Sequence, residues 1–151
     1  MSPDPALWPA LAVAGYGAFL DVKERRLPNW LCALLAIAAL GGTAYSAGAS
    51  LLPWTLLHAA ISLAVGMILF SVGAIGGGDA KFYAAAASAV PVNNALPMLG
   101  WTSATGLLLL VVMAFGRRVR RDARRTPLFR GWTVPYGAAI FAGFGLTLFR
   151  A

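Results

Sequence analysis

Long apolar runs separated by short polar or basic stretches follow one another from end to end of the sequence. A helix needs about 20 mostly apolar residues to cross the hydrocarbon core of a bilayer. The pattern therefore predicts about six membrane-spanning helices, at residues 5–20, 30–45, 54–75, 80–96, 98–115 and 132–149. The fourth is the least apolar, because Pro91, Asn93 and Asn94 interrupt it. We expect an all-α, polytopic membrane protein in which residues 1–151 form a single domain.

Composition supports a membrane protein over a soluble one. Hydrophobic residues make up 60% of the chain and charged residues 11%, whereas soluble domains carry roughly a quarter charged residues. The mean hydropathy is +0.75. The first apolar run lacks the preceding basic residues of a signal peptide, so we interpret it as a retained span.

The basic residues predict the orientation. The net charge is +7, but the lysines and arginines are clustered between apolar runs, which is typical of membrane topology rather than nucleic-acid binding. With both termini outside, every one of them except Arg150 lies on the cytoplasmic side. If residues 80–96 did not cross, the arginines from Arg117 to Arg130 would lie outside, which argues against five spans. We expect these arginines to attract anionic lipid, or else the secretion machinery.

Several residues are expected to be structural. A tryptophan stands near the start of most expected spans, where its ring anchors at the membrane interface: Trp8, Trp30, Trp54, Trp101 and Trp132. The lone histidine, His58, is expected to hydrogen-bond within the helix bundle rather than to act as a ligand or base. The single cysteine, Cys32, excludes an internal disulfide. Small residues in residues 54–75 and 80–96 are expected to let these two helices pack closely.

The carboxylates are the candidate catalytic groups. Asp4 is expected on the outer side, while Glu24 and Asp122 lie among basic residues and are interpreted as surface charges. Asp21 and Asp79 remain, each at the cytoplasmic boundary of an expected span. An ionisable group at membrane depth indicates a functional site.

Asp21 and Asp79 can meet if the first and fourth spans pack together. Two carboxyl groups that share a site cannot both ionise easily, so one keeps a proton while the other accepts one from water. The alternative is that each is an unpaired residue at a helix end. Helix dipoles favour the anion at Asp79, at the start of a helix, and the proton on Asp21, at the end of one. We therefore expect Asp79 to be the base and Asp21 the acid.

Two motifs surround these aspartates. Residues 21–29 read Asp-Val-Lys-Glu-Arg-Arg-Leu-Pro-Asn and residues 76–82 read Gly-Gly-Gly-Asp-Ala-Lys-Phe. They resemble the D-x-x-x-R-x-[IL]-P-N and G-x-G-D-x-K-[LF] signatures of the type IV prepilin peptidases, a family of GxGD-type membrane aspartic proteases. The resemblance extends to the six-span layout and implies one transmembrane peptidase domain.

The resemblance implies that Asp21 and Asp79 are the catalytic residues. Residues around them are expected to shape the site or bind substrate: Gly76, Gly77, Gly78, Lys81, Arg25, Pro28 and Asn29. The glycines are expected to permit a break between the third and fourth spans and a close approach of substrate backbone. Lys81 is alternatively a boundary lysine that reaches towards the headgroups.

The implied reaction is removal of the leader peptide from a prepilin or pseudopilin, at the cytoplasmic face of the bacterial inner membrane. No metal or other cofactor is expected. Larger members carry paired Cys-x-x-Cys motifs and also methylate the new N-terminus. This chain resembles the short, peptidase-only members of Flp-type (tight adherence) systems, so methylation is expected to be absent. Membrane lipids and the pilus assembly machinery are the other expected partners, and nucleic acid is not.

Two other interpretations remain open. A small proton- or cation-coupled transporter or channel subunit would use the same aspartates to bind its ion. An archaeal preflagellin peptidase, or a GxGD protease that cuts within the membrane, would use the same chemistry on another substrate.

Overall fold

The computed structural model describes residues 4–119 and 135–150, and every regular element in these residues is helical. The elements are η1 (Pro5–Leu7), α1 (Trp8–Glu24), α2 (Asn29–Ala47), η2 (Ala49–Leu51), α3 (Leu52–Ser71), α4 (Gly77–Ala87), η3 (Val92–Asn94), α5 (Ala95–Val119) and α6 (Tyr136–Arg150). The prediction of an all-α fold is confirmed for this part of the chain.

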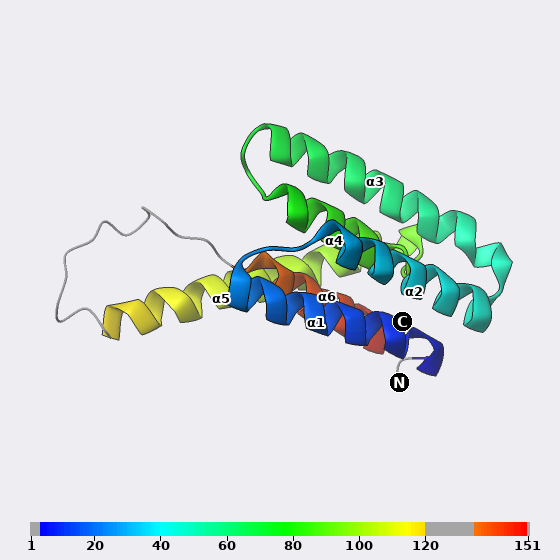
Figure 1. Cartoon of the computed structure of the whole chain (residues 1–151), viewed down its shortest axis with the longest axis horizontal. Coiled ribbons are helices and arrows are strands. Elements are labelled where there is room, and N and C mark those ends of the chain that lie inside the picture. Colours follow the sequence, from blue (N-terminus) through cyan, green and yellow to red (C-terminus); the bar gives the residue numbers. More distant parts are fainter. Residues whose placement is uncertain (1–3, 120–134, 151) are drawn as a thin grey trace.

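Within the described residues, four segments are long and apolar enough to cross a membrane. They are Pro5–Glu24, Asn29–Ala47, Ala49–Ser71 and Val92–Gly116, and Tyr136–Arg150 is a shorter apolar helix. Successive helices run in alternating directions, so the start of α1 and the end of α6 lie at the same end of the bundle (Figure 1). Residue 132, where the last span was expected to begin, lies outside the described residues.

The largest departure from the sequence prediction is α4. It ends at Ala87 instead of continuing to residue 96, and η3 then leads into α5, which begins at Ala95. Pro91 explains the break, because a proline inside a helix has no N–H and its ring clashes with the carbonyl four residues earlier. An 11-residue helix is about 16 Å long, roughly half the thickness of the hydrocarbon core.

His58 bonds to the segment that follows the end of α4. Its Nδ1 donates a buried hydrogen bond to the backbone carbonyl of Val90, at 2.8 Å. A carbonyl outside a helix and away from water needs such a donor. The prediction that the lone histidine is hydrogen-bonded within the bundle is confirmed.

The end of α3 also differs from the prediction, at Ser71 instead of residue 75. Gly73 has a φ of +75°, and the N–H groups of Gly73 and Ala74 donate to the carbonyls of Phe70 and Leu69 at 2.9 Å each. This is a Schellman motif, which ends a helix by placing a glycine in the left-handed conformation. The turn between α3 and α4 therefore depends on Gly73.

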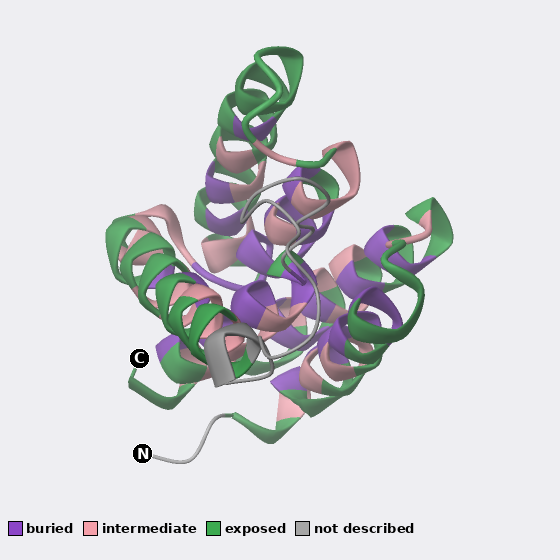
Figure 2. Ribbon diagram, turned by 90° about the vertical axis from the view of Figure 1, so that its left-hand side faces the viewer, coloured by how far each residue is buried: buried purple, intermediate pink, exposed green. Residues whose placement is uncertain are grey.

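The short helix α4 packs against α2, α3 and α6. The buried residues gather in the middle of the bundle (Figure 2). Nearly all residues of α4 from Ala80 to Ala87 are buried. A Cβ added to Gly66 of α3 would lie 2.8 Å from the Cβ of Ala80, so the absence of a side chain lets these helices approach closely. The expectation that small residues in these segments allow close helix packing is confirmed, and the structure shows that the two helices pack against each other.

Phe82 connects α4 to α1. Its ring is fully buried, and a Cβ added to Gly17 of α1 would lie 2.6 Å from Phe82 Cε2 and 3.0 Å from Leu31 Cδ2. Only a residue without a side chain at position 17 leaves room for the ring. This contact fixes the distance between α1 and α4.

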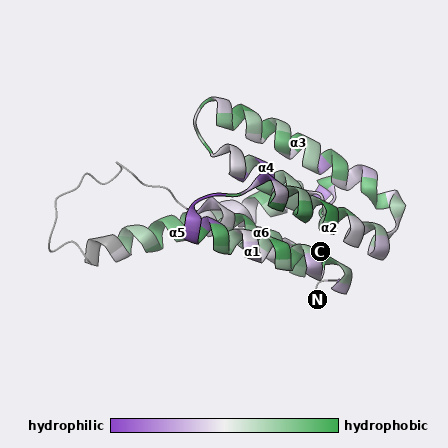
Figure 3. Ribbon diagram, viewed as in Figure 1, coloured by the Kyte–Doolittle hydropathy of each residue, from purple (hydrophilic) through white to green (hydrophobic). Residues whose placement is uncertain are grey.

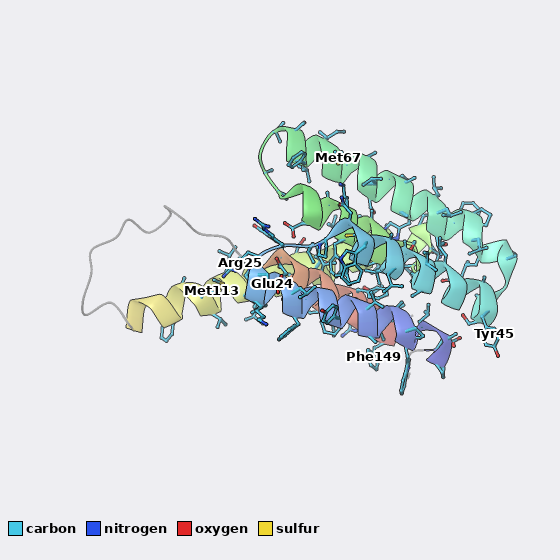
Figure 4. All side chains as sticks on the ribbon, viewed as in Figure 1. Glu24, Arg25, Tyr45, Met67, Met113 and Phe149 are labelled. Carbon is cyan, nitrogen blue, oxygen red and sulfur yellow. The ribbon has the colours of Figure 1, made fainter. Side chains whose placement is uncertain are left out.

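The polar residues of the described chain gather around the α1–α2 linker, while the outer faces of α3 and α5 are apolar (Figure 3). Exposed side chains on those faces include Ile61, Ile68, Leu107 and Val111. Glu24 and Arg25 lie at the polar end of the bundle, and Tyr45 and Phe149 lie at the opposite end (Figure 4). An apolar girdle with polar residues at one end is the arrangement that a bilayer selects.

Candidate active site

The two sequence motifs come together at one end of the bundle. The last turn of α1, the first turn of α4 and the first turn of α6 all lie there, next to the α1–α2 linker (Figure 1). Arg25 ends α1 in the left-handed conformation, with a φ of 56°, and its N–H donates to the Asp21 carbonyl at 3.0 Å. The chain then turns away from the carboxyl group of Asp21.

Asp21 is buried and bonded to a different helix. Its Oδ2 accepts a hydrogen bond from the backbone N–H of Gly137, the second residue of α6, at 2.7 Å. Only 7% of Asp21 is exposed. A Cβ added to Gly137 would lie 2.9 Å from both Cβ and Oδ2 of Asp21. The close approach of α6 to Asp21 therefore requires glycine at position 137.

Sequence reasoning missed Gly137. Its signal is Pro135-Tyr136-Gly137 at the start of an apolar run, which marks the beginning of a helix. Nothing in that pattern says which other segment faces the first turn. The contact with Asp21, 116 residues earlier, becomes visible only in the folded chain.

Asp79 lies in the first turn of α4 and bonds within its own helix. Gly76 is the N-cap of α4, and its backbone N–H donates to the Asp79 carboxylate. A side chain at the third helical position that reaches back to the N-cap N–H is one half of a capping box. A Cβ added to Gly76 would lie 2.7 Å from Asp79 Oδ2. Each aspartate is thus packed against one glycine.

The two carboxyl groups lie at the same end of the bundle, and the charge of Asp21 acts on Asp79. Burial raises the pKa of Asp79 from its ordinary value of 3.8 to about 6, the negative charge of Asp21 adds to the rise, and the hydrogen bond from Gly76 opposes it. An influence of Asp21 on Asp79 requires the two charges to be near one another in a region of low dielectric. The structure brings these two predicted site residues together.

Two helix ends act on Asp21. The argument from the sequence considered only the negative end of α1. In the structure the carboxyl group also lies at the N-terminus of α6, whose positive end and Gly137 N–H favour the anion. The order of base and acid expected from α1 and α4 alone stays a prediction.

Lys81 and Asn29 join α4 to α2. The Nζ of Lys81 donates to Asn29 Oδ1 at 3.1 Å, and both residues are near the start of their helices. Pro28 is the N-cap of α2, and its carbonyl accepts from the Leu31 N–H at 3.0 Å. This part of the first motif fixes the linker against α4.

The three glycines of the second motif have packing roles. Gly76 is extended, with φ −74° and ψ 143°, and Gly77 and Gly78 begin α4. An added Cβ would lie 3.4 Å from Phe70 Cε2 at Gly77 and 3.4 Å from Leu27 Cβ at Gly78. None of the three has a positive φ. The expected break between the third and fourth spans is therefore made by Gly73.

The remaining sequence predictions concern metal binding, the arginine cluster and the tryptophans. Among the described residues no group of three His, Cys, Asp or Glu side chains is arranged to hold a metal ion. The arginines from Arg120 to Arg130 and Trp132 lie outside the described residues. Trp8, Trp30 and Trp54 are each more than half exposed, as interfacial anchors require.

Replacing Gly76 with alanine is expected to lower kcat about tenfold, because misplacing a reacting group by a fraction of an ångström is costly. The backbone conformation of Gly76 is open to alanine, so the fold stays intact while the new methyl group displaces Asp79 Oδ2. Initial rates of prepilin cleavage, the activity that the sequence resemblance implies, measure the effect. Gly41→Ala is the control, because a Cβ there meets nothing within 4 Å. Equal rates in the two variants would contradict the proposed role of Gly76.

Comparisons with known proteins agree with the two motifs. No curated protein and no solved structure matches the chain. The type IV leader peptidase family matches residues 8–111, well over half of the chain and both motifs. The chain belongs to the type IV leader peptidase family.

Proposed function

We propose that this protein is an aspartic endopeptidase that removes the leader peptide of Flp-type prepilins or pseudopilins. The observation that carries the proposal is the meeting of Asp21 and Asp79. Asp21 of α1 is buried and Asp79 of α4 is half-buried. The negative charge of Asp21 helps to raise the pKa of Asp79. Paired carboxyl groups with different surroundings are the usual basis of acid–base hydrolysis by aspartates.

In the proposed reaction, the ionised carboxylate takes a proton from a water molecule, and the resulting hydroxide adds to the carbonyl carbon of the scissile peptide. The protonated carboxyl group gives its proton to the peptide nitrogen as the C–N bond breaks. The products are a leader with a free carboxyl group and a mature protein with a free amino group. The proton taken from water restores the protonation of the pair.

The proposed location is the bacterial inner membrane, with six passes, both termini outside and the site at the cytoplasmic face. The alternating helix directions support an even number of passes (Figure 1). The site lies at the same end as Lys23, Arg25 and Arg26, and basic residues favour the cytoplasmic side. These cations also provide a surface for anionic headgroups. From this position the site reaches a peptide bond just in front of a membrane-embedded pilin helix.

The proposed activity is cleavage without methylation. The linker between α1 and α2 is short, and the single Cys32 leaves no paired Cys-x-x-Cys motif in these residues. Both features resemble the peptidase-only members of Flp-type systems. The pilus assembly machinery is the proposed partner after cleavage.

Co-expression with a Flp-type prepilin, in cells that lack any other prepilin peptidase, tests this function. We expect a shortened pilin whose new N-terminus is unmethylated by mass spectrometry. A methylated N-terminus would reject the peptidase-only assignment. Full-length prepilin together with a membrane-inserted, folded protein would reject the substrate class, and proton or cation flux through the purified protein would then favour the transporter alternative.

A further inference from the structure

The contact between α6 and Asp21 assigns different tasks to the two aspartates. Building on the proposed peptidase function, we propose that Gly137 is a positioning residue whose backbone N–H holds Asp21 as the anion, so that Asp21 is the general base and Asp79 the general acid. The family match ends at residue 111, so α6 and Gly137 lie beyond it. The assignment is the reverse of the one that helix dipoles predict from the sequence.

The first step of the argument is the hydrogen bond itself. The Gly137 N–H has no acceptor within α6, because the first N–H groups of a helix lack partners. It donates instead to Asp21 Oδ2 at 2.7 Å, in a buried position. Hydrogen bonds to an ionised acceptor are shorter and roughly twice as strong as those to a neutral one. Both the bond and the positive end of α6 therefore stabilise the ionised form of Asp21. Asp79 accepts a corresponding bond from Gly76 at the start of α4, so the difference between the two aspartates must come from their other neighbours.

The second step is the difference in nearby charge. Burial opposes ionisation of the Asp21 carboxyl group, while the nearby Arg25 guanidinium favours it. The charge that acts on Asp79 is the negative charge of Asp21, and the adjacent Lys81 is bonded to Asn29. A cation favours ionisation and an anion opposes it. The proton that the pair shares accordingly resides on Asp79, whose pKa is raised to about 6.

Other ionisable groups lie at the same end of the bundle as the pair. The described ones are Lys23 and Glu24 of α1, Arg25 and Arg26 of the α1–α2 linker, Cys32 of α2, Lys81 of α4 and Tyr136 of α6, with Tyr83 further along α4. Asp79 and Lys81 both act on Cys32. His58 of α3, Tyr45 of α2 and Arg150 of α6 lie away from the site. Arg25 acts on Asp21, and Asp21 acts on Asp79.

Infrared spectroscopy of the resting protein locates the proton without any substrate. We expect the C=O stretch of a protonated carboxyl group to be present below about pH 6 and lost above it, as the raised pKa of Asp79 requires. The band should vanish in Asp79→Asn. In Asp21→Asn it should persist but titrate at lower pH, because the negative charge of Asp21 is gone. A band that survives in Asp79→Asn and vanishes in Asp21→Asn would overturn the assignment.

Kinetics of Gly137→Ala test the positioning role. The added Cβ would lie 2.9 Å from Asp21 Oδ2, so it displaces the carboxylate and weakens the bond that holds the anion. We expect kcat to fall about 30-fold, with KM nearly unchanged, because the change affects a reacting group. The acid limb of the pH profile of kcat/KM, which reports the base, should move up by about one pH unit.

Gly145→Ala is the matched control on the same helix, because its Cβ would lie 3.9 Å from Leu11 Cδ2, at ordinary contact distance. Its rate and pH profile should match those of the unchanged protein.

An acid limb that stays in place in folded Gly137→Ala would reject the role of Gly137. If instead Asp21→Asn and Asp79→Asn both cleave prepilin normally, the peptidase proposal fails, whatever the infrared result. If the infrared band survives in Asp79→Asn and vanishes in Asp21→Asn, and both variants fail to cleave prepilin, only the assignment of base and acid is rejected.

Discussion

Asp21→Asn and Asp79→Asn are each expected to lower prepilin cleavage by about a thousandfold or more, because each removes a proton-transfer group from the transition state. The protein should remain folded, since asparagine has nearly the same shape as aspartate. Its amide oxygen can still accept the hydrogen bond from Gly137 or Gly76. Initial rates with purified prepilin measure the loss, and thermal unfolding in the same detergent checks the fold.

Asp4→Asn is the control for these two variants. Asp4 precedes α1 at the opposite end of the bundle from the site, and its Oδ1 accepts the Ala6 N–H at 2.9 Å, a bond that asparagine can also make. Its cleavage rate should therefore be unchanged. If either Asp21→Asn or Asp79→Asn cleaved as fast as Asp4→Asn, the proposed pair would not be the catalytic pair.

Gly17→Ala is expected to have the second largest effect, a loss of about 100-fold in kcat, because small displacements of reacting groups are costly. The new Cβ would lie 2.6 Å from the buried ring of Phe82. Neither helix can accept it without moving, so α1 and α4 are pushed apart and Asp21 shifts relative to Asp79. Overpacking of this kind also costs about 1–3 kcal/mol of stability. The thermal midpoint and kcat are measured on the same preparation.

Two comparisons isolate this contact. Gly15→Ala on the same helix would place a Cβ 3.4 Å from Phe141 Cε2, at ordinary contact distance, and should retain nearly full activity. Phe82→Leu removes the ring atoms that face Gly17, so the double variant should regain a large part of the activity that Gly17→Ala loses. If the double variant instead loses kcat by the product of the two single losses, the Gly17–Phe82 contact does not position the aspartates.

The parts of the fold that follow from local sequence could be predicted. The start and end of α2 fall within two residues of the expected limits, because the apolar run has clear boundaries at Asn29 and Gly48. Asp21 and Asp79 were selected because a carboxylate beside an apolar run is costly to bury without a function. Both signals are carried by short, contiguous stretches of sequence.

The parts that depend on tertiary contacts could not be predicted. The position of Pro91 indicated a weak span, but the early end of α4 also depends on His58, which bonds to the Val90 carbonyl from another helix. Gly137 was missed because the segment that faces α6 is specified by packing. The dipole argument considered only the helix to which each aspartate belongs, so it did not include the terminus of α6 beside Asp21. The two aspartates can be identified from the sequence around them. Which of them is the base and which the acid depends on the residues that pack against each one.

The most direct test of the proposed function uses proteoliposomes that contain only this protein and a purified Flp-type prepilin. We predict two products by mass spectrometry, a leader peptide and a mature pilin cut in front of its hydrophobic helix, and no products when Asp79 is replaced by asparagine. Intact prepilin after prolonged incubation with the folded protein, or equal cleavage by Asp79→Asn, would contradict the account.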